Sequence, residues 1–173
     1  STPGLGGLNR LVADVGGGST ELIAGRDGRR TLGRSFPLGA VRLWEDLRPP
    51  AHPSSPDLAA CRRRVTALLE TQVGPVLAPA LEALSPGGLR LVGVGGTAVI
   101  LARILLALPD YHRDPIEQAC LQAPQLQELT EKLWSLPLEA RRALPGLPPE
   151  RADIILTGSV IFEQLLQFFR LPG

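Results

Sequence analysis

The most constraining feature of this sequence is a glycine-rich stretch between two short apolar runs, LVADVGGGSTELIAG at residues 11–25. The apolar run at 11–15 predicts a buried strand, and residues 20–24 predict the strand that returns beside it. Glycines between the two would form the tip of a β-hairpin, because glycine permits positive φ and leaves no Cβ in front of the backbone amides. The chain is therefore expected to open with a hairpin whose tip is Gly16, Gly17 and Gly18.

The chemistry of this tip suits a phosphate. Consecutive N–H groups in such a turn form a concavity that binds anions, and neighbouring hydroxyls can donate further hydrogen bonds. The carboxylates of Asp14 and Glu21 flank the tip, where such groups can hold a divalent metal or orient a water. A plain turn, in which Asp14 and Ser19 bond their own backbone, is the structural alternative. Besides the glycines, the candidate phosphate ligands are Ser19 and Thr20, and the candidate catalytic and metal-binding residues are Asp14 and Glu21.

A second glycine run, LRLVGVGGTA at residues 89–98, is again an apolar strand that ends in glycines, but an apolar helix is predicted to follow it at 99–106. The first amides of a helix are free and the helix dipole is positive there, so this junction favours a phosphate or a nucleotide. Gly95, Gly96 and Thr97 are its candidate phosphate ligands. Two such loops in one chain predict a cleft for a phosphorylated ligand.

Four segments, in this order along the chain, resemble the exopolyphosphatase / guanosine pentaphosphate phosphatase (Ppx/GppA) family. They are DVGGGSTEL at 14–22, FPLGAVRL at 36–43, VGVGGTA at 92–98 and RADIILTG at 151–158. The resemblance implies a ribonuclease H-like (actin-like ATPase) fold of two similar domains with the active site between them. This chain resembles the second domain. We therefore expect one α/β domain over residues 1–173, incomplete at its C-terminal edge, with a missing N-terminal actin-like domain as its partner.

For function, the resemblance implies a phosphohydrolase that releases terminal phosphate from inorganic polyphosphate or guanosine pentaphosphate, with Mg²⁺ held at Asp14 and Glu21. Arg42, in the second of the four segments, is a candidate contact to the polyanion. The general base of the family lies in the first domain, so the chain alone is expected to be inactive.

Two other functions fit the same fold. One is a noncatalytic module that binds polyphosphate or a nucleotide, and the other is a relative of sugar or acetate kinases that grips ATP. The Ser-Thr-Glu continuation at 19–21 and the segment at 36–43 favour the phosphatase branch over the kinase. The sequence does not separate the two phosphate substrates, and it leaves a homodimer open.

The remaining pattern predicts three antiparallel strands, then alternating helices and one strand, in a mixed sheet. The third strand is predicted at 29–38, after the turn Asp27-Gly28, and a short connection or helical turn follows at 38–47. Residues with helical spacing predict the other elements. These are helices at 56–73 with Ser55 as the N-cap, at 75–84, at 125–136, at 138–144 and at 149–170, with a loop at 109–115.

Composition argues against several classes of protein. The formal net charge is +1, which gives no support for nucleic acid or an acidic membrane surface as a partner. The longest apolar run, at 91–108, is broken by glycines and Arg103, so we expect a buried strand and helix rather than a membrane span. Cys61 and Cys120 lack metal-ligand or redox-motif spacing, and no signal peptide is recognisable, so we expect a soluble cytoplasmic protein. Because methionine is absent, we expect part of a longer protein.

Overall fold

A four-stranded mixed sheet organises the computed structural model, which describes residues 9–82, 84 and 88–172. β1 (Asn9–Val15), β2 (Thr20–Arg26) and β3 (Arg29–Phe36) form an antiparallel meander, and β4 (Leu89–Val94) lies parallel to β1. The strand order is β3-β2-β1-β4. The expected α/β mixed sheet with three opening antiparallel strands is confirmed. Residues 1–8 and 173 of the predicted single domain lie outside the described residues.

Alternate residues of the strands define the two faces of the sheet. Leu11, Ala13 and Leu22 are fully buried on one face, which contacts α3 (Gly74–Glu82) and α8 (Ile155–Phe168). Asp14 and Glu21 point to the opposite face, where side chains are half-buried. The hairpin pattern thus places both carboxylates outside the core.

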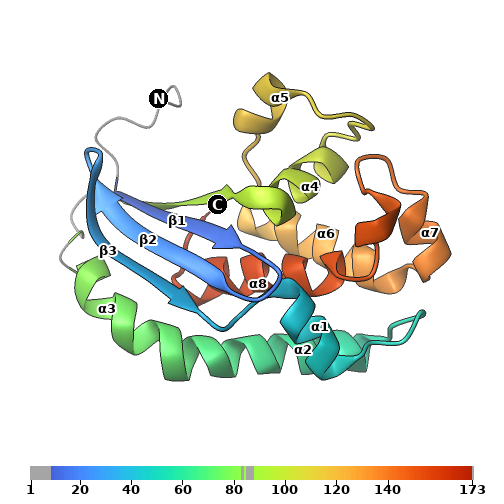
Figure 1. The fold of residues 1–173 in the computed structure, drawn as a ribbon, viewed down its shortest axis with the longest axis horizontal. Helices are drawn as coiled ribbons and strands as arrows, with labels where there is room; N and C mark the ends of the chain where they lie inside the picture. Colours follow the sequence, from blue (N-terminus) through green and yellow to red (C-terminus); the bar gives the residue numbers. More distant parts are fainter. Residues whose placement is uncertain (1–8, 83, 85–87, 173) are drawn as a thin grey trace.

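α8 is the central helix of the layer that packs against the sheet. It is buried from Ile155 to Leu166 and contacts α1, α2, α4 and α6. Figure 1 shows α2 and α3 running end to end along one side of the molecule, with α6 and α8 beside them. The other helices are α1 (Ala40–Leu47), α2 (Ser55–Leu68), α4 (Gly95–Leu105), α5 (Arg113–Glu117), α6 (Ala123–Ser135) and α7 (Leu138–Arg142). No helix in the described ranges is long and apolar enough to span a bilayer.

Two predicted boundaries around α2 were wrong. The N-cap is Ser54 rather than Ser55, because the Ser54 N–H donates to Asp57 Oδ2 at 2.8 Å in a capping box. Gly74-Pro75 does not interrupt the helix either. A π-helical turn, η1 (Leu69–Val73), joins α2 to α3 and ends two residues before Pro75, which has no N–H to donate.

Two predictions in the C-terminal half were also wrong. The predicted loop at 109–115 overlaps the short helix α5, which carries an i,i+4 ion pair between Arg113 and Glu117 at 2.7 Å. The single helix predicted at 149–170 is instead a 3₁₀ turn, η2 (Pro149–Arg151), followed by α8. The buried Arg141 explains the break, because its Nε donates to the Ala152 carbonyl at 2.8 Å and so takes an acceptor that a continuous helix would use.

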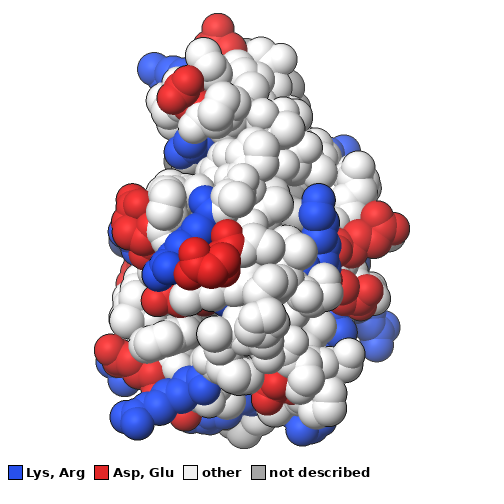
Figure 2. All heavy atoms as spheres, turned by 90° about the vertical axis from the view of Figure 1, so that its right-hand side faces the viewer, with Lys and Arg blue, Asp and Glu red and all other residues white. Residues whose placement is uncertain are grey.

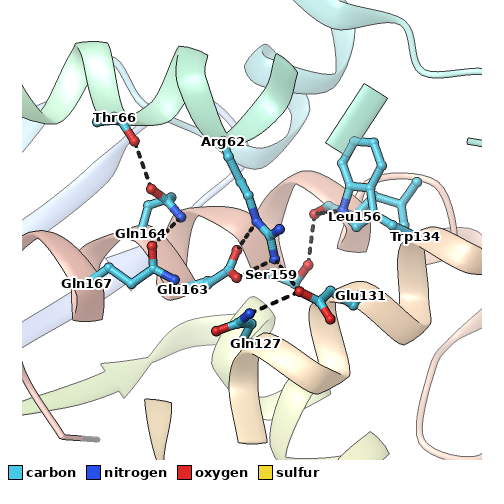
Figure 3. Close-up of polar contacts among 10 residues, drawn as sticks. All are labelled: Arg62, Thr66, Gln127, Glu131, Trp134, Leu156, Ser159, Glu163, Gln164 and Gln167. Atoms are coloured by element: carbon cyan, nitrogen blue, oxygen red, sulfur yellow. Dashed lines mark hydrogen bonds and ion pairs between the residues drawn. The ribbon is translucent and has the colours of Figure 1, made fainter. Parts of the chain in front are cut away.

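One arginine of α2, Arg62, is held by carboxylates on two other helices. Its guanidinium donates to both carboxylate oxygens of Glu163 on α8, at 2.6 and 3.0 Å, and to Glu131 on α6 at 3.2 Å. Figure 3 shows this ion pair lying between the three helices, beside a second link from Thr66 to Gln164. The Glu163 side chain is only 1% exposed. Arg62 therefore joins α2, α6 and α8.

Candidate functional site

The four sequence segments singled out above meet at one end of the sheet. β1 and β4 are parallel, so the hairpin tip that follows β1 and the start of α4 that follows β4 lie at the same edge. The Thr97 hydroxyl joins the two loops by donating to the Val15 carbonyl at 2.7 Å. The fourth segment reaches the same place, since the Thr157 hydroxyl donates to the Ala40 carbonyl at 2.7 Å.

The hairpin tip is clamped by the first turn of α1. The N–H groups of Ala40 and Val41 donate to the carbonyls of Gly16 and Gly17, each at 2.9 Å. Gly39 permits this contact, because a β-carbon there would lie 2.3 Å from the Gly17 oxygen. Gly39 was not among the predicted site residues. Its signal was the glycine inside FPLGAVRL, which is needed for close approach rather than for a turn.

The glycines of the tip do not have the positive φ that we expected. Positive φ is found instead at other glycines in the described part of the chain, including Gly95. The carbonyls of the tip face α1 and accept its hydrogen bonds. Gly17 and Gly18 are exposed, and their N–H groups donate no hydrogen bond within the described residues. The tip therefore presents free amides, as an anion site requires.

The start of α4 is a second set of free amides. The helix begins at Gly95, four residues earlier than predicted, and its N-cap Val94 offers no side-chain hydrogen bond. Gly95 has a φ of +79°, and a β-carbon there would lie 2.1 Å from Asp14 Oδ1. The Asp14 carboxylate therefore lies against the positive end of the helix dipole. No heavy atom lies within 4 Å of the β-carbon position of Gly96, so its surroundings are open.

Asp14 and Glu21 are cross-strand partners. Their Cα atoms pair directly between β1 and β2, which puts both side chains on the same face of the sheet. Glu21 Oε1 accepts hydrogen bonds from the hydroxyls of Ser19 and Ser35, both at 2.6 Å. These two hydroxyls lower the pKa of Glu21 below its ordinary value of 4.5, so the carboxylate is ionised at neutral pH. Ser35 was not among the predicted residues.

The remaining candidates divide by whether their side chains are free. Thr20 is fully buried and its hydroxyl donates to the Leu38 carbonyl, so we assign it to the core and withdraw it as a phosphate ligand. The hydroxyl of Thr97 is committed to Val15, which leaves the backbone N–H of Thr97 as its contribution. Arg42 is exposed and donates from Nε to the Gly18 carbonyl at 3.1 Å, so its outer N–H groups remain at the surface beside the tip.

The predicted cleft is not enclosed by the described residues. Gly17, Gly18, Gly95 and Gly96 are all exposed, so the two loops form an open surface. The neighbouring hollow, about 170 Å³ between α1 and α2, includes Arg42 in its lining but no residue of the hairpin tip or of the α4 start. Figure 2 shows mixed charge on the face at the right-hand side of Figure 1, where acidic and basic side chains are interspersed around a broad uncharged area.

Comparison with known sequences gives a consistent match. The model of the Ppx/GppA phosphatase family matches residues 6–172. Exopolyphosphatase 2 of Mycobacterium tuberculosis is 29% identical over 168 residues, which are 96% of this chain and 50% of that protein. A guanosine-5′-triphosphate,3′-diphosphate pyrophosphatase of Aeromonas hydrophila is 29% identical over 165 residues, 95% of this chain and 30% of that protein. The chain thus spans half or less of the length of these curated relatives.

Solved structures match the fold as well. The Aquifex aeolicus Ppx/GppA enzyme superposes with a TM-score of 0.80 at 24% identity, over 95% of this chain and 51% of that chain. An exopolyphosphatase from Cytophaga hutchinsonii superposes with a TM-score of 0.71 at 22% identity, over 99% and 53%. These likenesses confirm the expected actin-like fold class.

Proposed function

The chain belongs to the Ppx/GppA phosphatase family, and from this membership we propose that it is the phosphate-binding half of a phosphohydrolase. The proposed reaction is release of terminal phosphate from inorganic polyphosphate or guanosine pentaphosphate. One observation carries the proposal. Free amides of the hairpin tip and of the α4 start lie at the same edge of the sheet, beside two carboxylates that share one face.

The amides would bind the oxygens of the terminal phosphate. The N–H groups of Gly17 and Gly18 would donate from one side, and those at the start of α4 from the other, where the helix dipole adds a positive potential. Donors fixed in place by the fold stabilise charge that develops during phosphate release, because they need no reorientation. The exposed Arg42 would contact a phosphate further along the substrate.

Asp14 and Glu21 would hold Mg²⁺. Among the described residues no group of three or more His, Cys, Asp or Glu side chains forms a metal cluster, but Mg²⁺ in phosphate enzymes takes only one or two carboxylates together with substrate phosphates. A cross-strand pair with an ionised Glu21 fits that donor set. Bound there, the ion would neutralise phosphate charge.

The attacking water also needs a base. The relatives extend well beyond the matched region, and the resemblance assigns the base to their first domain. We propose that a preceding actin-like half supplies this group within hydrogen-bond reach of the water. The present chain then binds and orients the phosphate.

Gly96 offers a direct test of phosphate binding. Gly96→Asp should preserve or strengthen the fold, because a carboxylate at a helix start stabilises it by about 0.3–1 kcal/mol, yet it should repel a phosphate and weaken polyphosphate binding at least about tenfold. Gly96→Ala is the matched control, since it keeps the amide and has room for a methyl group. Titration calorimetry with polyphosphate and thermal unfolding of both variants measure the two effects. Wild-type affinity in a folded Gly96→Asp protein would exclude this site.

A further inference from the structure

Ser35 completes the arrangement around Glu21. We infer that Ser35 is a positioning residue for the Glu21 carboxylate: together with Ser19 it occupies one carboxylate oxygen, Oε1, and thereby leaves Oε2 to meet the ligand. The inference rests on the proposed function, because it adds a residue to the same site.

Ser35 belongs to a single row of residues that crosses the whole sheet. Asp14 pairs with Val94 of β4 on one side and with Glu21 of β2 on the other, and Glu21 pairs with Ser35 of β3. Paired residues of neighbouring strands project to the same face. The row lies at the edge where the hairpin tip and α4 begin. Ser35 is therefore connected to the carboxylate pair by the register of the strands.

The hydrogen bonds assign different tasks to the two oxygens of Glu21. Both hydroxyls donate to Oε1 at 2.6 Å, within the range of charge-assisted O–H···O⁻ bonds. Each hydroxyl has one hydrogen to give, so both are committed to this oxygen. No side chain of the described residues donates to Oε2. Glu21 is thus prepared to contact a ligand through one oxygen.

The competing explanation is that the Ser35 hydroxyl only helps to hold β2 and β3 together. Main-chain pairing already joins β2 to β3 from Thr20 and Phe36 to the hairpin turn, and Ser35 is exposed, so the ladder does not depend on its hydroxyl. A partly exposed glutamate would otherwise lose rotamer freedom only when its ligand binds. Two donors from different positions remove that freedom in advance. The hydroxyl of Ser35 therefore acts on Glu21 rather than on the strand.

Carboxyl NMR titration of the isotope-labelled chain tests this directly. In Ser35→Ala the pKa of Glu21 should rise toward its ordinary value of 4.5, because one of the two hydroxyls that lower it is gone. Ser35→Thr should restore the wild-type titration. Thr31→Ala is the matched control on β3, since that hydroxyl donates to the Ala24 carbonyl at 2.9 Å and not to Glu21. An unchanged Glu21 pKa in a folded Ser35→Ala protein overturns the inference.

A binding measurement then connects the position of Glu21 to the ligand. Titration calorimetry with polyphosphate and Mg²⁺ should show Ser35→Ala weakened by roughly three- to tenfold, with Ser35→Thr and Thr31→Ala close to wild type. Equal affinity of Ser35→Ala and wild type would also overturn the inference. If the wild-type chain itself binds no polyphosphate, the proposed function fails, and the NMR titration alone decides whether Ser35 positions Glu21.

Discussion

At the scale of single residues, Gly95 carries two constraints. Its φ of +79° suits only glycine without strain, and a β-carbon there would collide with Asp14 Oδ1. Gly95→Ala should therefore lower the free energy of unfolding by about 1–3 kcal/mol and displace the Asp14 carboxylate. Urea unfolding measures the loss, and Gly96→Ala is the control because its site is open and its φ is not positive. Equal stability of the two variants would contradict the close contact with Asp14.

Individual residues of the site could be predicted from the sequence when the reason was local. A glycine run between apolar strands identified the tip, and Asp14 and Glu21 followed as its flanks. The hydrogen-bond acceptor of each hydroxyl could not be predicted in this way. Whether Thr20 or Ser19 faces a ligand depends on which distant carbonyl or carboxylate accepts the hydrogen, and for Thr20 that acceptor is Leu38.

At the scale of elements, the ion pair of Arg62 with Glu163 holds three helices together. Arg62→Ala would leave the buried Glu163 carboxylate without its partner and should destabilise the fold by about 3 kcal/mol. Glu131→Ala is the matched control, because that side chain is 49% exposed and its pair should contribute at most about 1 kcal/mol. Denaturant unfolding of both variants distinguishes the two values. Similar small losses would show that Glu163 is solvated.

The pH dependence of this effect has a defined sign. Burial raises the pKa of Glu163, and the Arg62 guanidinium opposes that rise. A carboxyl group whose pKa is raised in the folded state favours folding at low pH, and this advantage is lost as pH rises through the folded pKa. Without Arg62, nothing from that guanidinium opposes the rise that burial causes in the pKa of Glu163. The stability deficit of Arg62→Ala should therefore be largest at neutral pH and shrink as pH falls toward 4.5 and below.

The positions of helices and strands were predictable where the hydrophobic pattern was strong. The predictions failed where tertiary contacts determined the register or the end of an element. Apolar runs separated by glycine-containing turns located the three opening strands. The register of β3 was not predictable, because a bulge between Ala24 and Gly25 shifts the pairing and brings Ser35, instead of its neighbour Arg34, opposite Glu21. Likewise, helical spacing ran through Ala152, while the hydrogen bond from Arg141 ended the helical turn there.

At the scale of the whole molecule, we expect from the open surface of the site that phosphate binding and base catalysis lie in different domains. We predict that the purified chain binds polyphosphate but releases no detectable orthophosphate from it, because the proposed base lies in another domain. An orthophosphate assay on the chain, beside a protein in which a preceding actin-like half is joined to it, measures this. Release by the chain at the rate of the joined protein would place the base within these residues. Binding without release by either protein would favour a noncatalytic module.

At this scale the sequence predicted that the two glycine loops share one cleft, and the parallel pairing of β1 with β4 brings these loops to the same edge of the sheet. The openness of the site was not, because exposure of Gly17 and Gly96 depends on what else packs against the edge.

Because β4 is an edge strand of the sheet, it also affects the tendency of this protein to aggregate at high concentration. One side of β4 pairs with β1, and its other side carries unpaired main-chain groups among the described strands, with Val94 38% exposed. An edge strand of this kind is a template with which another strand can pair, and natural sheets usually protect it with lysine, proline or a bulge. The sequence of β4, LRLVGV, has a single charge, at Arg90. Colloidal behaviour of the chain, and its tendency to form ordered aggregates, should therefore depend on these six residues more than on its nearly neutral net charge.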